Sequence, residues 1–239
     1  MRNMVGNMRT IKCASHFEYQ LYKKIKNGYS PIVMICGEQR IGKSAYALHI
    51  CNMFSRFMYE EDFDYKKYSF YDTEKVIEEM GNMTKRVILI DEGGESLDYL
   101  DWYEKIAKAM RSMINTQAFR GNIYIIINPF VVEILKNIRK HFNFKVHVVD
   151  RGYVKIWKYV KKHNAEKQDK ASYPVFLDYL RFPISLLPPG MYKGYKEYSE
   201  AEKDKMVEKR LNETKHKKKR SKLSKKERLE NLIGDNNAN

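Results

Sequence analysis

The sequence has few cysteines and no apolar run long enough to cross a bilayer. Its three cysteines, Cys13, Cys36 and Cys51, are too scattered for a disulfide framework or a zinc knuckle, which predicts a reducing, intracellular setting. The longest apolar stretch, residues 123–135, contains polar residues and is shorter than the ~20 residues of a membrane helix. Residues 1–10 also lack the apolar core of a secretory signal. We therefore expect a soluble, cytoplasmic protein without a membrane span of its own.

Negative charge is also scarce, because 30 Asp and Glu residues stand against 45 Lys and Arg, for a net charge of +15. More than half of that excess lies in residues 215–228, which hold nine basic residues and one Glu. Such a segment binds nucleic-acid phosphates without reading sequence, so DNA is the expected partner. A solvated tail and a localisation signal are the rival interpretations. The candidate contacts are Lys217, Lys218, Lys219, Arg220, Lys222, Lys225 and Lys226.

Apolar residues are plentiful, at 43% of 239 residues, and provide the core of one main domain. Fully apolar runs at residues 32–36, 87–90 and 123–127 alternate with helical patterns. Such runs predict an α/β fold with a mostly parallel central sheet and helices on both faces. Residues 144–150 and 153–160 alternate polar and apolar positions, which predicts an antiparallel hairpin at one edge. In that hairpin, Tyr153, Trp157 and Tyr159 are either packing residues or rings that stack on nucleic-acid bases.

The chain divides into four expected segments. They are a helical lead-in at 1–29, an α/β core at 30–160, a C-terminal extension packed on the core at 161–213, and a basic, disordered tail at 214–239. The extension is expected to lie over the domain because prolines punctuate its apolar residues.

The stretch GEQRIGKS, residues 37–44, matches the pattern G-x-x-x-x-G-K-[ST]. It follows an apolar strand and precedes a helix, which is the context a phosphate-binding loop requires. Glycines let the backbone amides converge on phosphates, Lys43 reaches the β- and γ-phosphates, and the Ser44 hydroxyl binds Mg²⁺. The expected nucleotide-binding residues are Gly37, Glu38, Gln39, Arg40, Ile41, Gly42, Lys43, Ser44 and Ala45. The alternative is a plain turn between strand and helix.

Two further strand ends carry polar residues suited to hydrolysis. Asp91 ends the run VILID and is placed to hold Mg²⁺, while Glu92 follows as the candidate that activates the attacking water. Asn128 is the first polar residue after IYIII and is a candidate sensor of the γ-phosphate. The alternatives are an acidic turn cap at Asp91 and a turn that starts a helix at Asn128.

Together these motifs resemble the additional-strand, catalytic-glutamate (ASCE) division of P-loop ATPases, over roughly residues 30–150. The stretch QAFRGNIYIIIN looks most like the HerA/FtsK-like group, which includes viral DNA-packaging ATPases and Zot-like assembly ATPases of filamentous phages. The resemblance implies a RecA/ASCE-like sheet in which the 123–127 strand lies between the other two. Asn stands where that group commonly has Gln, and Asn also suits AAA+ relatives.

The resemblance further implies ATP and Mg²⁺ as cofactors and a homo-oligomeric ring, expected to be a hexamer. One subunit's arginine would then complete its neighbour's site, with Arg120 as the first candidate and Arg111 and Arg139 behind it. The implied function is a ring motor that packages or translocates DNA for a virus or mobile element, inside the host cell. The alternatives are a Zot-like ATPase acting with a virion or membrane assembly protein, an AAA+-type replication loader, and a nucleotide-dependent structural or binding protein with little turnover.

Overall fold

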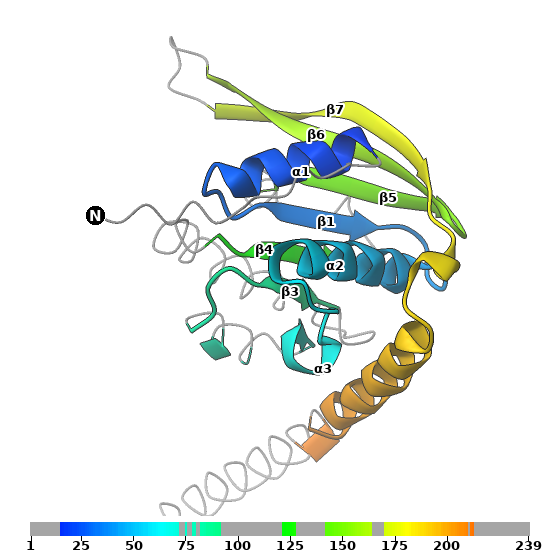
Figure 1. The fold of residues 1–239 in the computed structure, drawn as a ribbon. Helices are drawn as coiled ribbons and strands as arrows, with labels where there is room; N and C mark the ends of the chain where they lie inside the picture. Colours follow the sequence, from blue (N-terminus) through cyan, green and yellow to red (C-terminus); the bar gives the residue numbers. More distant parts are fainter. Residues whose placement is uncertain are drawn as a thin grey trace, which may run out of the picture. The chain divides into compact units, whose positions relative to one another are not determined.

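The computed structural model describes residues 15–71, 75, 78–79, 82–91, 121–127, 142–163, 170–209 and 211–212. Its centre is a seven-stranded sheet in the order β2-β3-β4-β1-β5-β6-β7 (Figure 1). The strands are β1 (Ile32–Cys36), β2 (Ser69–Phe70), β3 (Val87–Ile90), β4 (Ile123–Ile127), β5 (Phe144–Asp150), β6 (Tyr153–His163) and β7 (Lys170–Arg181).

The first five strands of that order run parallel, which confirms the predicted α/β fold with a mostly parallel sheet. Strand β4 pairs with β1 on one side and with β3 on the other, in the registers Ile35↔Ile127 and Ile90↔Ile126. The additional strand therefore lies where the sequence resemblance predicted it. As a result, the carboxyl ends of β1, β3 and β4 meet at one edge of the sheet.

Every residue of β1, β3 and β4 is buried, on both faces of the sheet. This explains why these strands read as unbroken apolar runs, since neither face meets water. Val33 and Ile35 face a core formed with the helices, and Met34, on the opposite face, is equally inaccessible at 0%. Residues 102–116 and 131–140, whose sequences also predict helices, lie outside the described residues.

Two helices lie on the same face of the sheet, drawn in front of the strands in Figure 1. The N-cap of helix α1 (His16–Lys26) is Ser15, whose hydroxyl accepts a hydrogen bond from the amide of Glu18. It packs Phe17 edge-on against Phe144 of β5, with ring centroids 5.2 Å apart. Helix α2 (Lys43–Tyr59) covers β1, β3 and β4 with a mainly buried set of residues that includes Leu48.

The sheet continues beyond the parallel part through two antiparallel strands. The predicted hairpin of β5 and β6 is present, and it turns at Gly152, where φ is +80°. The extension after residue 160, expected to lie over the domain, instead completes β6 and supplies β7, which pairs with β6 along its whole length. Pro174 is compatible with this strand because β7 ends the sheet order, and a proline at an edge removes no ladder hydrogen bond.

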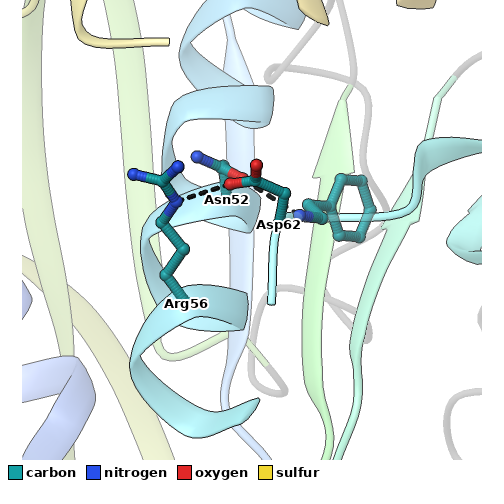
Figure 2. Close-up of polar contacts among 4 residues, drawn as sticks. Asn52, Arg56 and Asp62 are labelled. Atoms are coloured by element: carbon teal, nitrogen blue, oxygen red, sulfur yellow. Dashed lines mark hydrogen bonds and ion pairs between the residues drawn. The ribbon is translucent and has the colours of Figure 1, made fainter. Parts of the chain in front are cut away.

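The end of α2 is tied to the loop that follows it (Figure 2). The side-chain oxygen of Asn52, which is 4% exposed, accepts a 2.9 Å hydrogen bond from the amide of Phe63. One turn later, Arg56 forms an exposed ion pair with Asp62. The chain then enters α3 (Tyr65–Tyr68), which precedes β2. These contacts hold the connection between the helix and the edge strand β2.

The chain separates into two compact units, Met1–Tyr195 and Lys196–Asn239. The first ends with η2 (Ile184–Leu186) and the start of a helix that spans residues 191–209. Within the second unit, Glu202 pairs with Lys205 at 2.7 Å. None of the helices in the described ranges is long and apolar enough to cross a membrane. The predicted basic tail lies outside the described residues.

Candidate nucleotide-binding site

The phosphate loop, residues 37–44, connects the end of β1 to the start of α2. Its first residue, Gly37, has φ +144°, and a Cβ there would come within 2.5 Å of the Val148 carbonyl oxygen in β5. Only glycine fits so close to the neighbouring backbone. Gly42 ends the loop at φ +105°, and Arg40 between them takes a left-handed φ of +60°. These conformations curl the backbone back over the end of the sheet.

Helix α2 starts with Gly42 as its N-cap, and among the described residues no side chain caps it. The amides of a helix's first turn lack intrahelical partners and carry the positive end of the helix dipole. In this chain the turn begins with Lys43, Ser44 and the buried Ala45. Since it points its amides toward the loop, this end of α2 is suited to bind phosphate. Glu38, Gln39 and Arg40 are exposed at the loop's outer side.

The Lys43 ammonium folds back over the phosphate loop. Its Nζ donates to the carbonyl oxygen of Gly37 at 2.9 Å and to that of Glu38 at 2.6 Å. Both acceptors are backbone atoms of the loop, so the lysine's charge is held where the β- and γ-phosphates of a nucleotide would lie.

Asp91 lies just beyond β3, and its side chain meets the start of α2. Its Oδ2 accepts from the Ser44 hydroxyl at 3.4 Å and from the Tyr195 hydroxyl at 2.8 Å. Asp91 is 3% exposed, and its backbone amide donates to the carbonyl oxygen of Phe70 in β2 at 3.0 Å. A hydroxyl oxygen beside a carboxylate is the kind of hard-oxygen pair that Mg²⁺ prefers as ligands. Ser44 and Asp91 therefore fit the predicted metal role.

Burial and nearby cations set the acidity of the groups around the loop. Burial raises the pKa of the Cys36 thiol to about 12, although the ammonium groups of Lys145 and Lys43 oppose this rise. Burial also lowers the pKa of His147, helped by Lys145, while Glu38 acts in the opposite direction. At neutral pH these groups are uncharged, which leaves Lys43 as the cation held over the loop carbonyls.

The structure brings the predicted loop residues 37–45 and Asp91 into one site. The other predicted catalytic residues, Glu92, Asn128 and Arg120, lie outside the described residues, as do Arg111 and Arg139. In the sequence, however, Glu92 directly follows Asp91, and Asn128 directly follows the last residue of β4. The predicted nucleic-acid contacts also lie outside the described residues; they are Lys217, Lys218, Lys219, Arg220, Lys222, Lys225 and Lys226.

Sequence reasoning missed Tyr195, which donates a hydrogen bond to Asp91 at 2.8 Å, shorter than the one from Ser44. The residue is 1% exposed, and its ring packs edge-on against Tyr65 at 5.8 Å. Burial raises the pKa of this phenol, with the Asp91 charge as the next contribution, so it stays protonated and donates. Tyr195 follows Asp91 by 104 residues, and no local motif marks it.

No protein-family model matches the sequence, and no curated protein matches it either. Among solved structures, the chain is similar to the N-terminal domain of zonular occludens toxin from Neisseria meningitidis, at 15% identity and a TM-score of 0.36. That match covers 63% of this chain and 95% of the other.

The chain is also similar to the genome packaging NTPase B204 from Sulfolobus turreted icosahedral virus 2 in complex with ATP-gammaS. The identity is 11%, the coverage 60% of this chain and 96% of that chain, and the TM-score 0.37. B204, the DNA-packaging ATPase from Sulfolobus turreted icosahedral virus, gives 15% identity, coverage of 62% and 99%, and a TM-score of 0.34. At TM-scores this low, the likenesses carry no weight for function, which depends on this chain's own residues.

Proposed function

We propose that this chain binds ATP with Mg²⁺ in the phosphate loop and hydrolyses it. The observation that carries the proposal is the meeting of two motifs far apart in the sequence. The hydroxyl of Ser44, beside the glycine-bounded loop, contacts the buried carboxylate of Asp91 at the end of β3. Loop amides for phosphate and oxygen ligands for a metal thus lie at the same edge of the sheet.

Each described residue has a distinct task in this proposal. The loop amides and the first turn of α2 bind the phosphates, and Lys43 exchanges its two carbonyl partners for β- and γ-phosphate oxygens. Ser44 and Asp91 hold the cation, and Tyr195 keeps the Asp91 carboxylate oriented. Bound Mg²⁺ supplies positive charge against the phosphate oxygens.

Hydrolysis further requires residues that the sequence supplies next to this site. We assign Glu92 as the base that takes a proton from the attacking water, and Asn128 as the amide that senses the γ-phosphate. Arg120 is assigned as the residue that a neighbouring subunit would insert in a homo-oligomeric ring, for which a hexamer is the expected size.

The proposed substrate of this motor is DNA, in packaging or translocation for a virus or mobile element. Its support is the net charge of +15 and the basic segment at 215–228. Two tests separate DNA from a protein substrate: DNA should stimulate ATP hydrolysis, and deletion of residues 215–239 should weaken DNA binding. Hydrolysis that is indifferent to DNA would favour the Zot-like assembly function instead.

The hydrolytic site is tested with Lys43→Ala and Glu92→Gln, and with Lys66→Ala in α3 as a charge-matched control. Both site variants should lose hydrolysis by on the order of 100-fold, because each removes a group that acts on the reacting phosphate or water. Glu92→Gln should still bind ATP, whereas Lys43→Ala should bind it weakly. Hydrolysis that persists in both variants would refute the site.

A further inference from the structure

One face of strands β5, β6 and β7 carries aromatic rings interleaved with cations. We propose that this face binds single-stranded nucleic acid, with bases stacked on its rings and phosphates paired with its Lys and Arg side chains. The inference rests on the proposed function in taking nucleic acid as the substrate class. It adds a binding surface within the folded sheet, separate from the basic segment at 215–228.

The contacts of α1 distinguish the two faces of this part of the sheet. Asp178 of β7 accepts a 2.5 Å hydrogen bond from the amide of Phe17, and Lys158 of β6 donates to Gln20 at 2.9 Å. Asp178 and Lys158 therefore point toward α1, in front of the sheet in Figure 1. Side chains alternate along a strand, so the positions next to Lys158 point to the opposite face. That opposite face is the aromatic–basic face.

Two pairs of aromatic rings lie on the aromatic–basic face. Trp157 of β6 meets Phe176 of β7 edge-on, with centroids 6.1 Å apart, and Tyr153 stacks against Tyr179 at 6.1 Å and 17° between planes. Phe176 is 57% exposed and Tyr179 is 54% exposed. Large rings this open, side by side on neighbouring strands, offer flat surface to a ligand instead of filling a core.

Cations border these rings on the same face. The Lys145 ammonium lies 5.1 Å from the centre of the Trp157 ring. Lys155 is exposed, and Tyr179 is its partner across the strands, while Arg181, also exposed, pairs with Tyr153 at the hairpin end. Two carboxylates of the described residues lie near them: Asp150 is paired with Tyr153, and Glu38 is close enough to raise the pKa of His147, which is paired with Lys155. The face is thus net positive and complements a phosphate backbone.

This combination favours a single strand over a duplex. In a duplex the bases are stacked within the helix and present no ring face to a flat sheet, so only the cations would contribute. A single strand exposes its bases, and stacking on aromatic side chains contributes to binding without selecting sequence. Residues two apart on a strand are about 6.6 Å apart, so rings and cations alternate at a short, regular interval along β6.

The test measures how the full-length protein binds a fluorescein-labelled oligothymidine of about 30 nucleotides, by fluorescence anisotropy over a range of salt. Phe176→Ala removes an exposed ring, and Tyr29→Ala is its control, because Tyr29 is 59% exposed and lies outside the sheet. Lys155→Ala removes a charge from the aromatic–basic face. Lys158→Ala removes the same charge from the same strand on the opposite face.

Phe176→Ala should weaken binding to the single strand by about 5- to 150-fold, the usual range for losing one stacking partner. Lys155→Ala should reduce the slope of log affinity against log salt by about 0.7, as expected for one lost phosphate contact on a single strand. Tyr29→Ala and Lys158→Ala should bind as the wild type does. With a duplex of equal length, Phe176→Ala should show no loss. Thermal unfolding checks that each variant is folded.

Several results would overturn the inference. If folded Phe176→Ala and Lys155→Ala bind the oligonucleotide like the wild type, the face does not bind nucleic acid while the proposed function stands. If these two variants bind the oligonucleotide like the wild type but change the sedimentation coefficient, the face is instead a contact between copies of the chain. Equal losses in the control variants would show that the effect is not confined to this face. Wild-type protein that binds neither single strand nor duplex would overturn the proposed DNA substrate as well.

Discussion

Replacing Tyr195 with Phe removes one hydroxyl from the centre of the candidate site and preserves the ring. The edge-on packing against Tyr65, at 5.8 Å and 88°, should survive, so any loss reports the polar contacts of the hydroxyl, which include the hydrogen bond to Asp91 and an interaction with Tyr71. That bond is 2.8 Å long and ends on a carboxylate that is 3% exposed. The hydrogen bond from Ser44, at 3.4 Å, is longer than the usual O–H···O range of about 2.5–3.0 Å, so it is too weak to replace it.

Two magnitudes follow from this geometry. A hydrogen bond to a buried charged group contributes about 1.5–3 kcal/mol, so the free energy of unfolding should fall by about that amount. Loss of a partner that orients a metal ligand lowers metal affinity by about 10- to 100-fold. The Mg²⁺ concentration that half-saturates binding of a fluorescent ATP analogue should rise by the same factor. Binding without Mg²⁺ should be unchanged, because the phosphate loop and Lys43 are intact.

The matched control is Tyr65→Phe, which removes a hydroxyl from the same ring pair. It should leave the Mg²⁺ titration at the wild-type position. If Tyr195→Phe lowers stability but its Mg²⁺ titration coincides with that of the wild type, Tyr195 is a packing residue and the reasoning is wrong. A titration shifted equally in both variants would also refute it, since the effect would then belong to the ring pair.

Three further perturbations test the structure around the site. Gly37→Ala should lower the free energy of unfolding by more than the ~1–3 kcal/mol of positive-φ strain, because its Cβ meets a β5 carbonyl at 2.5 Å. Gly190→Ala, also at positive φ but with open space around it, should show strain alone in the same urea titration. The Cys36 thiol, with its pKa raised to about 12, should resist alkylation at pH 8 until the protein unfolds. The contribution of this protonated thiol to the free energy of unfolding is fully present below pH ~9 and should be lost as pH rises toward 12. Peptide mass spectrometry checks the alkylation, and unfolding measured over a range of pH checks the loss of stability. Asn52→Ala should destabilise by about 1–3 kcal/mol because it leaves a buried amide without its acceptor, whereas Arg56→Ala, at an exposed ion pair, should destabilise less; equal losses in calorimetry would contradict this.

The parallel part of the sheet was predictable because burial on both faces leaves a direct signature in the sequence. Strands β1, β3 and β4 are unbroken apolar runs, and the loop GEQRIGKS and Asp91 mark two of their carboxyl ends. The order of these strands came from the family resemblance and not from the runs themselves. Local periodicity carries no information about which strand lies between which.

Strand β7 was not predictable from alternation. The register between β6 and β7 shifts between Ile156 and Trp157, so Phe176 and Asp178 oppose adjacent residues of β6. The extra residue, Leu177, breaks the alternation of polar and apolar positions. Pro174, taken from the sequence alone, further suggests a loop and not a strand. Tyr195 was missed for another reason, because its partner is distant in the sequence and only the folded chain brings the two together.

Carbonyl oxygens of the loop would compete with the phosphates of a nucleotide for the Lys43 ammonium. If Lys43 binds a nucleotide as proposed, its hydrogen bonds to the carbonyls of Gly37 and Glu38 must first be broken, so a phosphate would gain only the free-energy difference between the two arrangements. In exchange, the loop is already curled when the nucleotide arrives, and little ordering is left to oppose binding. On the proposed function, nucleotide association would therefore exchange the oxygen partners of the Lys43 nitrogen, and release would follow by the reverse exchange.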